Sequence, residues 1–281
     1  MRNVCFGRID VAIPKVEVEG LKLSRVICGT NPFFGFSHCS AARDTWLKRY
    51  FTDDRIVEVM AKCADMGVNC VLGGAGERMR KILDRVEEST GVHFYWLYTP
   101  GGFGRDEVMA DISASAEFAP DICLPHQMFT DNNLVAAENR INGAEEVLAH
   151  IRSLGMIPGW STHRPETILT SDRSGYDVPF IIQPCNPIGF LCQVEIEWIV
   201  QVIRNTPRHV IAIKPLAAGR ITAPTGLRFV LSSIKPTDFV AVGFMSPEEV
   251  EEDLGLVEGI FQDAGEASGL THSRSKKILE G

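Results

Sequence analysis

The stretch VNCVLGGAGERMRKILDRVEES (residues 68–89) contains one complete unit of the pattern that decides the fold. Residues 68–73 are almost wholly apolar, glycines follow, and residues 77–89 have apolar side chains at helical spacing. A short apolar strand followed by an amphipathic helix is the unit of a parallel sheet that helices cover on both faces. The stretch therefore predicts a strand, a short loop and a helix.

Similar apolar runs, rich in Val and Ile, recur along the chain and alternate with stretches of helical period. The predicted strands are 26–30, 68–73, 93–99, 121–126, 157–162, 180–184, 209–214 and 239–244. Eight such units without a linker predict an α/β protein that forms one (β/α)8 TIM barrel. A doubly wound sheet is the alternative, and it is disfavoured because no GxGxxG fingerprint follows the first strand.

The two ends of the chain lie outside these units. Apolar and polar residues alternate around Gly20, so we expect an N-terminal β-hairpin within residues 1–25. Residues 263–281 are polar and rich in small side chains, which predicts a short C-terminal extension outside the barrel. We expect residues 1–281 to form a single domain.

The composition excludes several classes of protein. The net charge of −8 and the absence of a basic stripe argue against nucleic-acid binding. The first residues lack the continuous apolar region of a signal peptide, and no apolar run is long enough to span a membrane. Eight cysteines without a CxxC pair are typical of reduced core thiols. We therefore expect a cytoplasmic protein whose partner is a small molecule, with its oligomeric state undetermined.

The carboxyl ends of the strands are the expected place of the active site, because βα loops carry the chemistry of this fold. Polar side chains at or just beyond these ends are Asn31, Tyr98, His126, Ser161, Thr162, His163, Gln183, Asn186 and Lys214. No acidic residue lies directly at a strand end, which disfavours a paired-carboxylate hydrolase or a Mg²⁺ site. No HxxxH or CxxC spacing supports a bound metal, so none is predicted.

His126 and Lys214 are the main catalytic candidates. His126 directly follows a predicted strand and could act as acid or base, although a structural histidine held by a backbone carbonyl is the alternative. Lys214 ends another strand and could hold an anion, transfer protons or form an imine, or else pair with a carboxylate structurally. Asn31, His163 and Asn186 are the candidate substrate-binding residues. We expect His126 and Lys214 to face each other across one polar mouth.

The order of the segments resembles the aldo/keto reductase superfamily. The resemblance rests on LKLSRVICGT (21–30), CADMGVNCVLG (63–73), DICLPHQ (121–127), GMIPGWSTHRPETI (155–168), IIQPCNP (181–187), IKPLAAGRI (213–221) and GLRFVLSSIKPTDFVAVGFMSPEEVEED (226–253). It implies a barrel with a hairpin closing its bottom and an oxidoreductase-like activity linked to a nicotinamide cofactor.

The resemblance also shows what this chain lacks. Of the reductive tetrad, only the histidine that orients the carbonyl has a match, at His126. The aspartate position falls on Leu72, no tyrosine follows in GGAGE, and the lysine position falls near Tyr98 or Thr99. Standard carbonyl reduction is therefore not expected, and Tyr98 is the candidate substitute proton donor.

The cofactor pocket implied by the resemblance is incomplete. Ser161 and Gln183 match positions that hold the carboxamide, and Thr162 stands where an asparagine is usual. Gly243 and Ser246 fall beside the expected cofactor at the last strand and helix. Three residues beyond Ser246 an acidic side chain would repel a 2′-phosphate, which argues against NADP and leaves NAD undecided.

Three functions remain open on this basis. The first is a non-redox enzyme that uses acid/base or imine chemistry on a small anionic substrate, a carboxylate or phosphate, at the barrel mouth. The second is a nicotinamide-dependent oxidoreductase with a non-standard proton donor. The third is a ligand-binding protein without catalysis.

Overall fold

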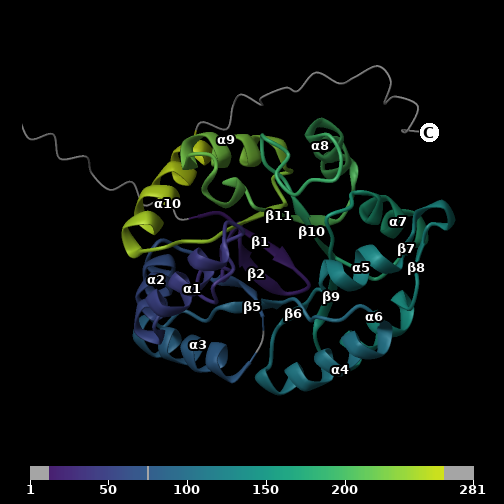
Figure 1. Cartoon of the computed structure of the whole chain (residues 1–281), viewed down its shortest axis with the longest axis horizontal. Helices are drawn as coiled ribbons and strands as arrows, with labels where there is room; N and C mark the ends of the chain where they lie inside the picture. The colour runs from purple at the N-terminus through teal and green to yellow at the C-terminus, as the bar shows by residue number, and fades with distance from the viewer. Residues whose placement is uncertain (1–12, 75, 263–281) are drawn as a thin grey trace, which may run out of the picture.

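The computed structural model describes residues 13–74 and 76–262, and its central feature is a closed barrel of parallel strands (Figure 1). The neighbouring strands around the ring are β10, β11, β12, β3, β4, β5, β6 and β9. Their bounds are β3 (Val26–Gly29), β4 (Cys70–Gly73), β5 (Tyr95–Tyr98), β6 (Ile122–Cys123), β9 (Ile157–Ser161), β10 (Phe180–Pro184), β11 (His209–Ile213) and β12 (Phe239–Val242). Each of the eight predicted strands overlaps one of these, so the predicted (β/α)8 barrel is confirmed.

The helices lie around the outside of the strands (Figure 1). They are α1 (Ala41–Tyr50), α2 (Asp53–Asp65), α3 (Glu77–Thr90), α4 (Arg105–Ser115), α5 (Gln127–Asn133), α6 (Ala144–Ser153), α7 (Glu166–Ser174), α8 (Ile196–Asn205), α9 (Ala223–Ser233) and α10 (Pro247–Gln262). Short 3-10 turns are η1 (Ala116–Phe118), η2 (Ala136–Glu138) and η3 (Ala217–Gly219), and a small ribbon joins β7 (Leu134–Val135) to β8 (Arg140–Ile141).

The predicted N-terminal hairpin is present and packs against the interior of the barrel. Strand β1 (Lys15–Val18) pairs antiparallel with β2 (Leu21–Ser24). The turn between them places Glu19 at φ 49° and Gly20 at φ 85°, a conformation that glycine adopts without steric cost. Val18 and Leu23 are buried among side chains that fill the barrel.

Side chains of each strand alternate between two apolar layers. The inner layer includes Leu97, Leu124 and Ile182, whereas their neighbours in sequence Trp96 and Ile181 belong to the layer between strands and helices. Successive residues of a strand point to opposite faces of the sheet. Which residues of a strand point inward therefore decides which side chains beyond its end can reach the mouth of the barrel.

The amphipathic helices cover the outer layer as predicted. Helix α2 buries Ile56, Val59, Met60 and Cys63 on one side, at the spacing expected of a helix face. Full burial of each such side chain contributes roughly 1.5–3 kcal/mol to folding. Between β3 and α2, residues 41–50 form α1, whose N-terminus is capped by the hydroxyl of Ser40.

Some predictions fall outside the described residues. The C-terminal extension (263–281) and the first twelve residues belong to this group. The described cysteines are all unpaired, and most of them are buried, in agreement with the prediction of core thiols. Within residues 13–74 and 76–262, no helix is long and apolar enough to cross a membrane.

Candidate functional site

The alternation of side chains brings three predicted residues to the mouth of the barrel. Leu124 faces the interior, so His126, two positions later, lies on the same face of its strand. Ile157 also faces the interior, so Ser161 and His163, four and six positions later, point inward as well. The backbone N–H of Ser161 donates to the carbonyl of Pro125 at 2.9 Å, which fixes Ser161 beside His126.

Lys214 reaches the same mouth from the end of β11. Its backbone adopts φ 61°, a left-handed conformation that turns the chain sharply after the strand. The carbonyl of Lys214 accepts a hydrogen bond from the N–H of Ala217 at 3.0 Å, which closes this turn. Among the described residues, no group forms a hydrogen bond or ion pair with its ammonium. Lys214 is therefore held in place by its backbone and not by a side-chain partner.

The electrostatics of the mouth show that Lys214 and the histidines lie close together. Burial lowers the pKa of Lys214 to about 8. Burial also lowers the pKa values of His38, His126 and His163, and in each case the charge of Lys214 lowers them further. The structure thus brings together His126 and Lys214, as expected, and adds His38 from the loop after β3. We call His38, His126, His163 and Lys214 the mouth cluster.

His126 presents one defined tautomer. It caps the N-terminus of α5, where its Nδ1 accepts a hydrogen bond from the backbone N–H of Met128 at 3.4 Å. A neutral imidazole that accepts at Nδ1 carries its proton on Nε2. Because the pKa of His126 is lowered, the neutral form predominates at pH 7. The Nε2–H of His126 is consequently a hydrogen-bond donor, and no described group accepts from it.

The pKa of His163 makes a testable prediction about stability. Burial, followed by the charges of Lys214, His126 and His38, lowers this pKa to about 4. The unfolded chain takes up the proton near pH 6.5 and the folded chain only near pH 4. His163 therefore favours the folded state fully above pH 6.5, and this contribution, up to about 3 kcal/mol, is lost as the pH falls through 4. Urea unfolding between pH 7 and pH 4 measures the loss.

The control for this prediction is a pair of variants. His163→Gln should have a free energy of unfolding that changes less over this pH range than that of the wild type. His150→Gln, on the outer helix α6, should follow the wild type. An unchanged pH dependence in His163→Gln would contradict the assignment.

A half-buried carboxylate, not identified from the sequence, positions the loop that carries His163. Asp131 of α5 accepts hydrogen bonds from the hydroxyl of Thr162 and from the backbone N–H of His163, the latter at 3.0 Å. Burial raises the pKa of Asp131, and these hydrogen bonds oppose that shift. The hydroxyl of Thr162 also contacts Thr167 at 2.9 Å and the backbone of Arg164. Asp131 therefore connects α5 to the loop after β9.

Backbone strain is concentrated in the loops around the mouth. Of the described non-glycine residues with positive φ, five lie in the loops after β3, β10 and β11: His38, Leu191, Lys214, Ala217 and Ala218. Such conformations cost of order 1–3 kcal/mol and are frequent at functional sites. Their concentration supports the assignment of this end of the barrel as the site.

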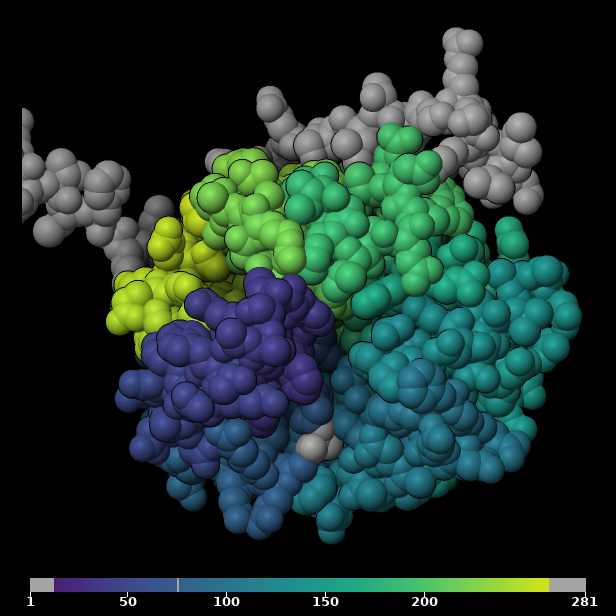
Figure 2. Space-filling model, viewed as in Figure 1, coloured from purple at the N-terminus to yellow at the C-terminus, as the bar shows by residue number. Residues whose placement is uncertain are grey.

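Arg220 connects the same three loops. Its guanidinium lies 4.2 Å from the centre of the Phe190 ring and donates to the carbonyl of His38 at 3.3 Å and to that of Ala217 at 3.0 Å. In addition, the thiol of Cys39 donates to the carbonyl of Ala218 at 3.7 Å. Figure 2 looks onto this face and shows a narrow hollow at its centre, between the purple-blue segment and the green and teal loops.

The predicted substrate-binding asparagines have different surroundings. Asn31 is exposed, and its Nδ2 lies 3.4 Å from Nε2 of His38, at the edge of the mouth cluster. Asn186 is fully buried, and its amide is used within its own loop. Its Nδ2 donates to the carbonyl of Phe190 at 2.9 Å, and its Oδ1 accepts from the N–H of Phe190 at 2.7 Å. Asn186 thus shapes the loop after β10.

Two other predicted residues do not join the mouth cluster. Tyr98 belongs to the layer between strands and helices, where its hydroxyl accepts a hydrogen bond from Ser115 of α4 at 2.9 Å. Burial raises the pKa of Tyr98, which makes it a poorer proton donor. Gln183 follows the interior residue Ile182 and so points to the opposite, outer face. Both predictions assumed the wrong face of a strand.

The cofactor pocket implied by the family resemblance is therefore poorly matched. Thr162 is fully buried and engaged by Asp131, and Gln183 points outward with its Oε1 unpaired among the described residues. Only Ser161 of the three predicted carboxamide partners faces the mouth. Of the residues that the resemblance assigns to the nicotinamide, Thr162 and Gln183 therefore do not face the mouth.

Gly243 and Ser246 lie at the end of β12 and the start of α10. A Cβ at Gly243 would lie 2.9 Å from Pro32, so this position accepts only glycine without a shift of the loop after β3. The hydroxyl of Ser246 accepts from the N–H of Glu249 at 3.3 Å and so caps the start of α10. Glu249 in turn accepts from the backbone N–H of Met245 at 2.7 Å.

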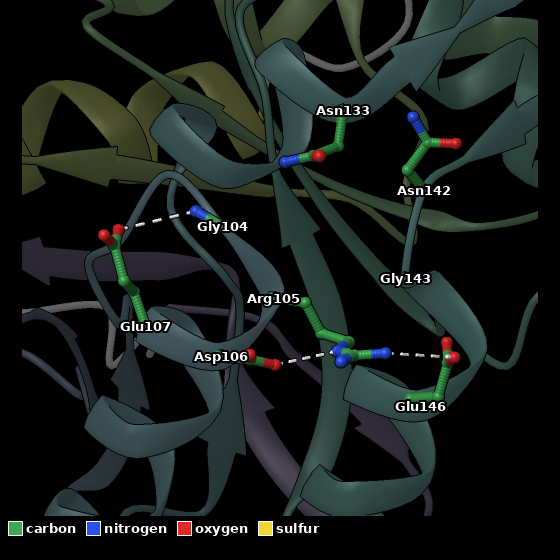
Figure 3. Close-up of a pocket in the computed structure, with 8 residues that line it drawn as sticks. All are labelled: Gly104, Arg105, Asp106, Glu107, Asn133, Asn142, Gly143 and Glu146. Carbon is green, nitrogen blue, oxygen red and sulfur yellow. Dashed lines mark hydrogen bonds and ion pairs between the residues drawn. The ribbon is translucent and has the colours of Figure 1, made fainter.

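Two hollows of the surface lie away from the mouth cluster. One, of about 440 Å³, is lined by residues at the starts of α4 and α6, and Figure 3 shows Arg105 between Asp106 and Glu146 inside it. Another, of about 380 Å³, lies beside the hairpin near Val18 and His209. Their polar groups are largely paired, as in the contacts of Arg105 at 3.0 and 3.6 Å. The candidate site is assigned to the mouth instead, because Lys214 lies near His38, His126 and His163 there. Within the described ranges, no three His, Cys, Asp or Glu side chains could hold a metal ion.

Comparisons with known proteins relate the barrel to solved structures, several of which are aldo-keto reductases. No protein-family model matches the sequence, and no curated protein matches it. A structure named as an aldo-keto reductase from Pseudomonas aeruginosa superposes with a TM-score of 0.65 at 15% identity, covering 90% of this chain and 96% of that one. The aldo/keto reductase from Brucella melitensis gives 0.58 at 12% identity, covering 87% and 93%. The aldo/keto reductase from Klebsiella pneumoniae, solved with NADP and acetate, gives 0.55 at 12% identity, covering 93% and 91%. The chain therefore has the barrel fold of the aldo-keto reductases, closed at one end by an N-terminal hairpin.

Proposed function

We propose that the protein is a small-molecule enzyme that binds an anionic carbonyl compound in the mouth cluster and acts on it by imine or acid/base chemistry. One observation carries this proposal: a half-buried amine, Lys214, lies among three histidines with no acidic partner among the described residues. The barrel shared with the reductases supports an enzyme, and the mismatched tetrad and cofactor pocket argue against standard carbonyl reduction.

The lowered pKa of Lys214 gives it two useful forms near neutral pH. At a pKa of about 8, roughly one molecule in ten has a neutral amine at pH 7. The ammonium form attracts a carboxylate or phosphate, because buried charges interact more strongly than those in water. The neutral form is the nucleophile that imine formation requires.

His126 supplies the complementary proton. Its Nε2–H donates a hydrogen bond to the carbonyl oxygen of the substrate, which polarises the bond. The nitrogen of Lys214 then attacks the carbonyl carbon, and the oxygen takes up a proton. Loss of this oxygen as water leaves a C=N bond to Nζ of Lys214. An acid of this kind typically contributes 10²–10⁴-fold to the rate.

Reductive trapping tests the proposal directly. The protein is incubated with a panel of aldehydes and 2-oxo acids, reduced with borohydride, digested and analysed by mass spectrometry. We expect the adduct at Lys214, none in Lys214→Met, and slower trapping in His126→Asn. The control Lys81→Met removes an exposed lysine of α3 and should trap like the wild type. Adducts spread over surface lysines without enrichment at Lys214 would exclude imine chemistry.

A nicotinamide-dependent oxidoreductase is the second candidate function. The shared fold and the position of Ser161 beside His126 favour it. Fluorescence titration with NADH and NADPH separates the two candidates, because the proposed imine enzyme requires neither. Saturable binding of either nucleotide, lost in Ser161→Val, would support the second.

A further inference from the structure

Large apolar side chains are exposed around the mouth cluster. Among the described residues, the most exposed large apolar side chains in loops after barrel strands are those of Phe36 (58%), Phe103 (59%), Ile188 (55%) and Leu191 (40%). Phe36 lies in the loop after β3, and Ile188 and Leu191 lie in the loop after β10. Exposed apolar groups gathered around a site are typical of a binding surface, whereas scattered ones need no explanation.

The loop after β10 holds its apolar residues in a fixed conformation. Both polar atoms of the buried Asn186 amide bind the backbone of Phe190, at 2.9 and 2.7 Å. Leu191 is kept at φ 56°, which costs a non-glycine residue roughly 1–2 kcal/mol. In this conformation Ile188 and Leu191 are exposed to water.

This apolar loop adjoins the mouth cluster. Cys192, next to Leu191, lies close enough to Lys214 for each charged form to affect the pKa of the other. Arg220 packs on Phe190 and donates to the carbonyl of His38, so the loops after β3 and β10 both contact Arg220. A molecule bound at Lys214 can therefore extend over Ile188 and Leu191. We call Phe36, Ile188 and Leu191 the apolar rim.

We propose that the substrate is amphiphilic, with an anionic head at Lys214 and an unbranched or aromatic apolar tail on the apolar rim. This inference rests on the proposed function and narrows its substrate class. The positive charge of Lys214 favours an anionic head. Because the apolar rim adjoins the mouth cluster, an apolar tail attached to that head can lie on the rim. Contact with a tail removes apolar surface of both partners from water.

Chain-length dependence tests the inference. Straight-chain carboxylates from acetate to decanoate are titrated into the full-length protein by calorimetry, below the concentrations at which they form micelles. A fully buried CH₂ contributes about 0.8 kcal/mol, or a fourfold change in Kd, so we expect a two- to fourfold tighter Kd for each added CH₂ on the half-exposed rim. The double variant Ile188→Ser/Leu191→Ser should lose most of this dependence and bind acetate as the wild type does.

Two further variants separate this inference from the proposed function. Leu154→Ser removes an apolar side chain of similar exposure (38%) that follows α6, far from the mouth loops, and should keep the wild-type dependence. Lys214→Met should weaken all carboxylates by a similar factor, on the order of 10- to 100-fold. Binding of short carboxylates without chain-length dependence would overturn the amphiphilic substrate and leave the proposed function standing. Chain-length dependence that Lys214→Met does not weaken would instead overturn the role of Lys214.

A second copy of the chain is the competing occupant of the rim. Sedimentation velocity decides this point. A monomer that retains the chain-length dependence agrees with the inference. A dimer that the double variant dissociates, and that long carboxylates do not disrupt, would overturn it.

Discussion

Replacing Lys214 with methionine is expected to stabilise the protein while removing its function. The pKa of Lys214 is lowered to about 8 by burial, whereas an unfolded lysine titrates near 10.4. Below pH 8 both states carry the proton, and the folded state bears the full cost of a buried charge. This cost amounts to up to about 3 kcal/mol at pH 7 and disappears as the pH rises from 8 to 10.4.

Urea unfolding of wild type and Lys214→Met between pH 7 and pH 10 measures this effect. We expect the variant to be more stable at pH 7 and the difference to shrink as the pH rises. Imine trapping should be lost completely, because methionine has no amine. Such a trade of stability for activity is common at active sites.

Lys214→Arg is the matched control for this prediction. Arginine keeps the positive charge, so it should bring no gain in stability, and it cannot form the imine. If Lys214→Met is less stable than the wild type at pH 7, the ammonium has a stabilising partner. The assignment of Lys214 as a desolvated, unpaired charge would then be wrong.

Replacing Asp131 with alanine is expected to destabilise the protein and to disturb His163. The change removes the acceptor of hydrogen bonds from the Thr162 hydroxyl and the His163 N–H. Hydrogen bonds to charged groups contribute about 1.5–3 kcal/mol each, and a buried donor left unpaired adds a penalty, so we expect a loss of about 3 kcal/mol. Urea unfolding gives the loss, and NMR titration of the His163 ring reports its changed surroundings.

Asp131→Asn distinguishes a loss of charge from a loss of hydrogen bonds. Its Oδ1 can accept from the N–H of His163, and its Nδ2 can donate to the Thr162 oxygen, whose proton then turns to the carbonyl of Arg164 at 3.1 Å. We expect this variant to lose less than about 1 kcal/mol. A loss as large as that of Asp131→Ala would show that the negative charge itself is required.

The residues missed or misplaced by sequence reasoning share a physical cause. Strands of a parallel barrel are apolar on both faces, so their sequences do not show which side chains point inward. A shift of one residue exchanges the two faces. Tyr98 and Gln183 stand at strand ends for which the sequence does not distinguish the mouth from the outer face, and in the structure both face outward.

Contacts between segments that are distant in the chain could not be predicted from the sequence. Asp131 stands in a short helix with no motif, and only its proximity to Thr162 gives it a role. Arg220 follows a predicted strand end, yet its contacts with His38 and Phe190 come from loops far away in the chain. Spacing along the chain carries no information about such pairs.

The sequence by itself determined the order of strands and helices, the hairpin around Gly20 and the polar residues at the strand ends. These features follow from local periodicity and turn chemistry, which a single segment expresses. Only the tertiary structure decided that His38 joins His126, His163 and Lys214, and that Asn186 braces an apolar loop. The reason is that closure of the barrel, and not any local preference, brings the ends of separate strands within reach of one another.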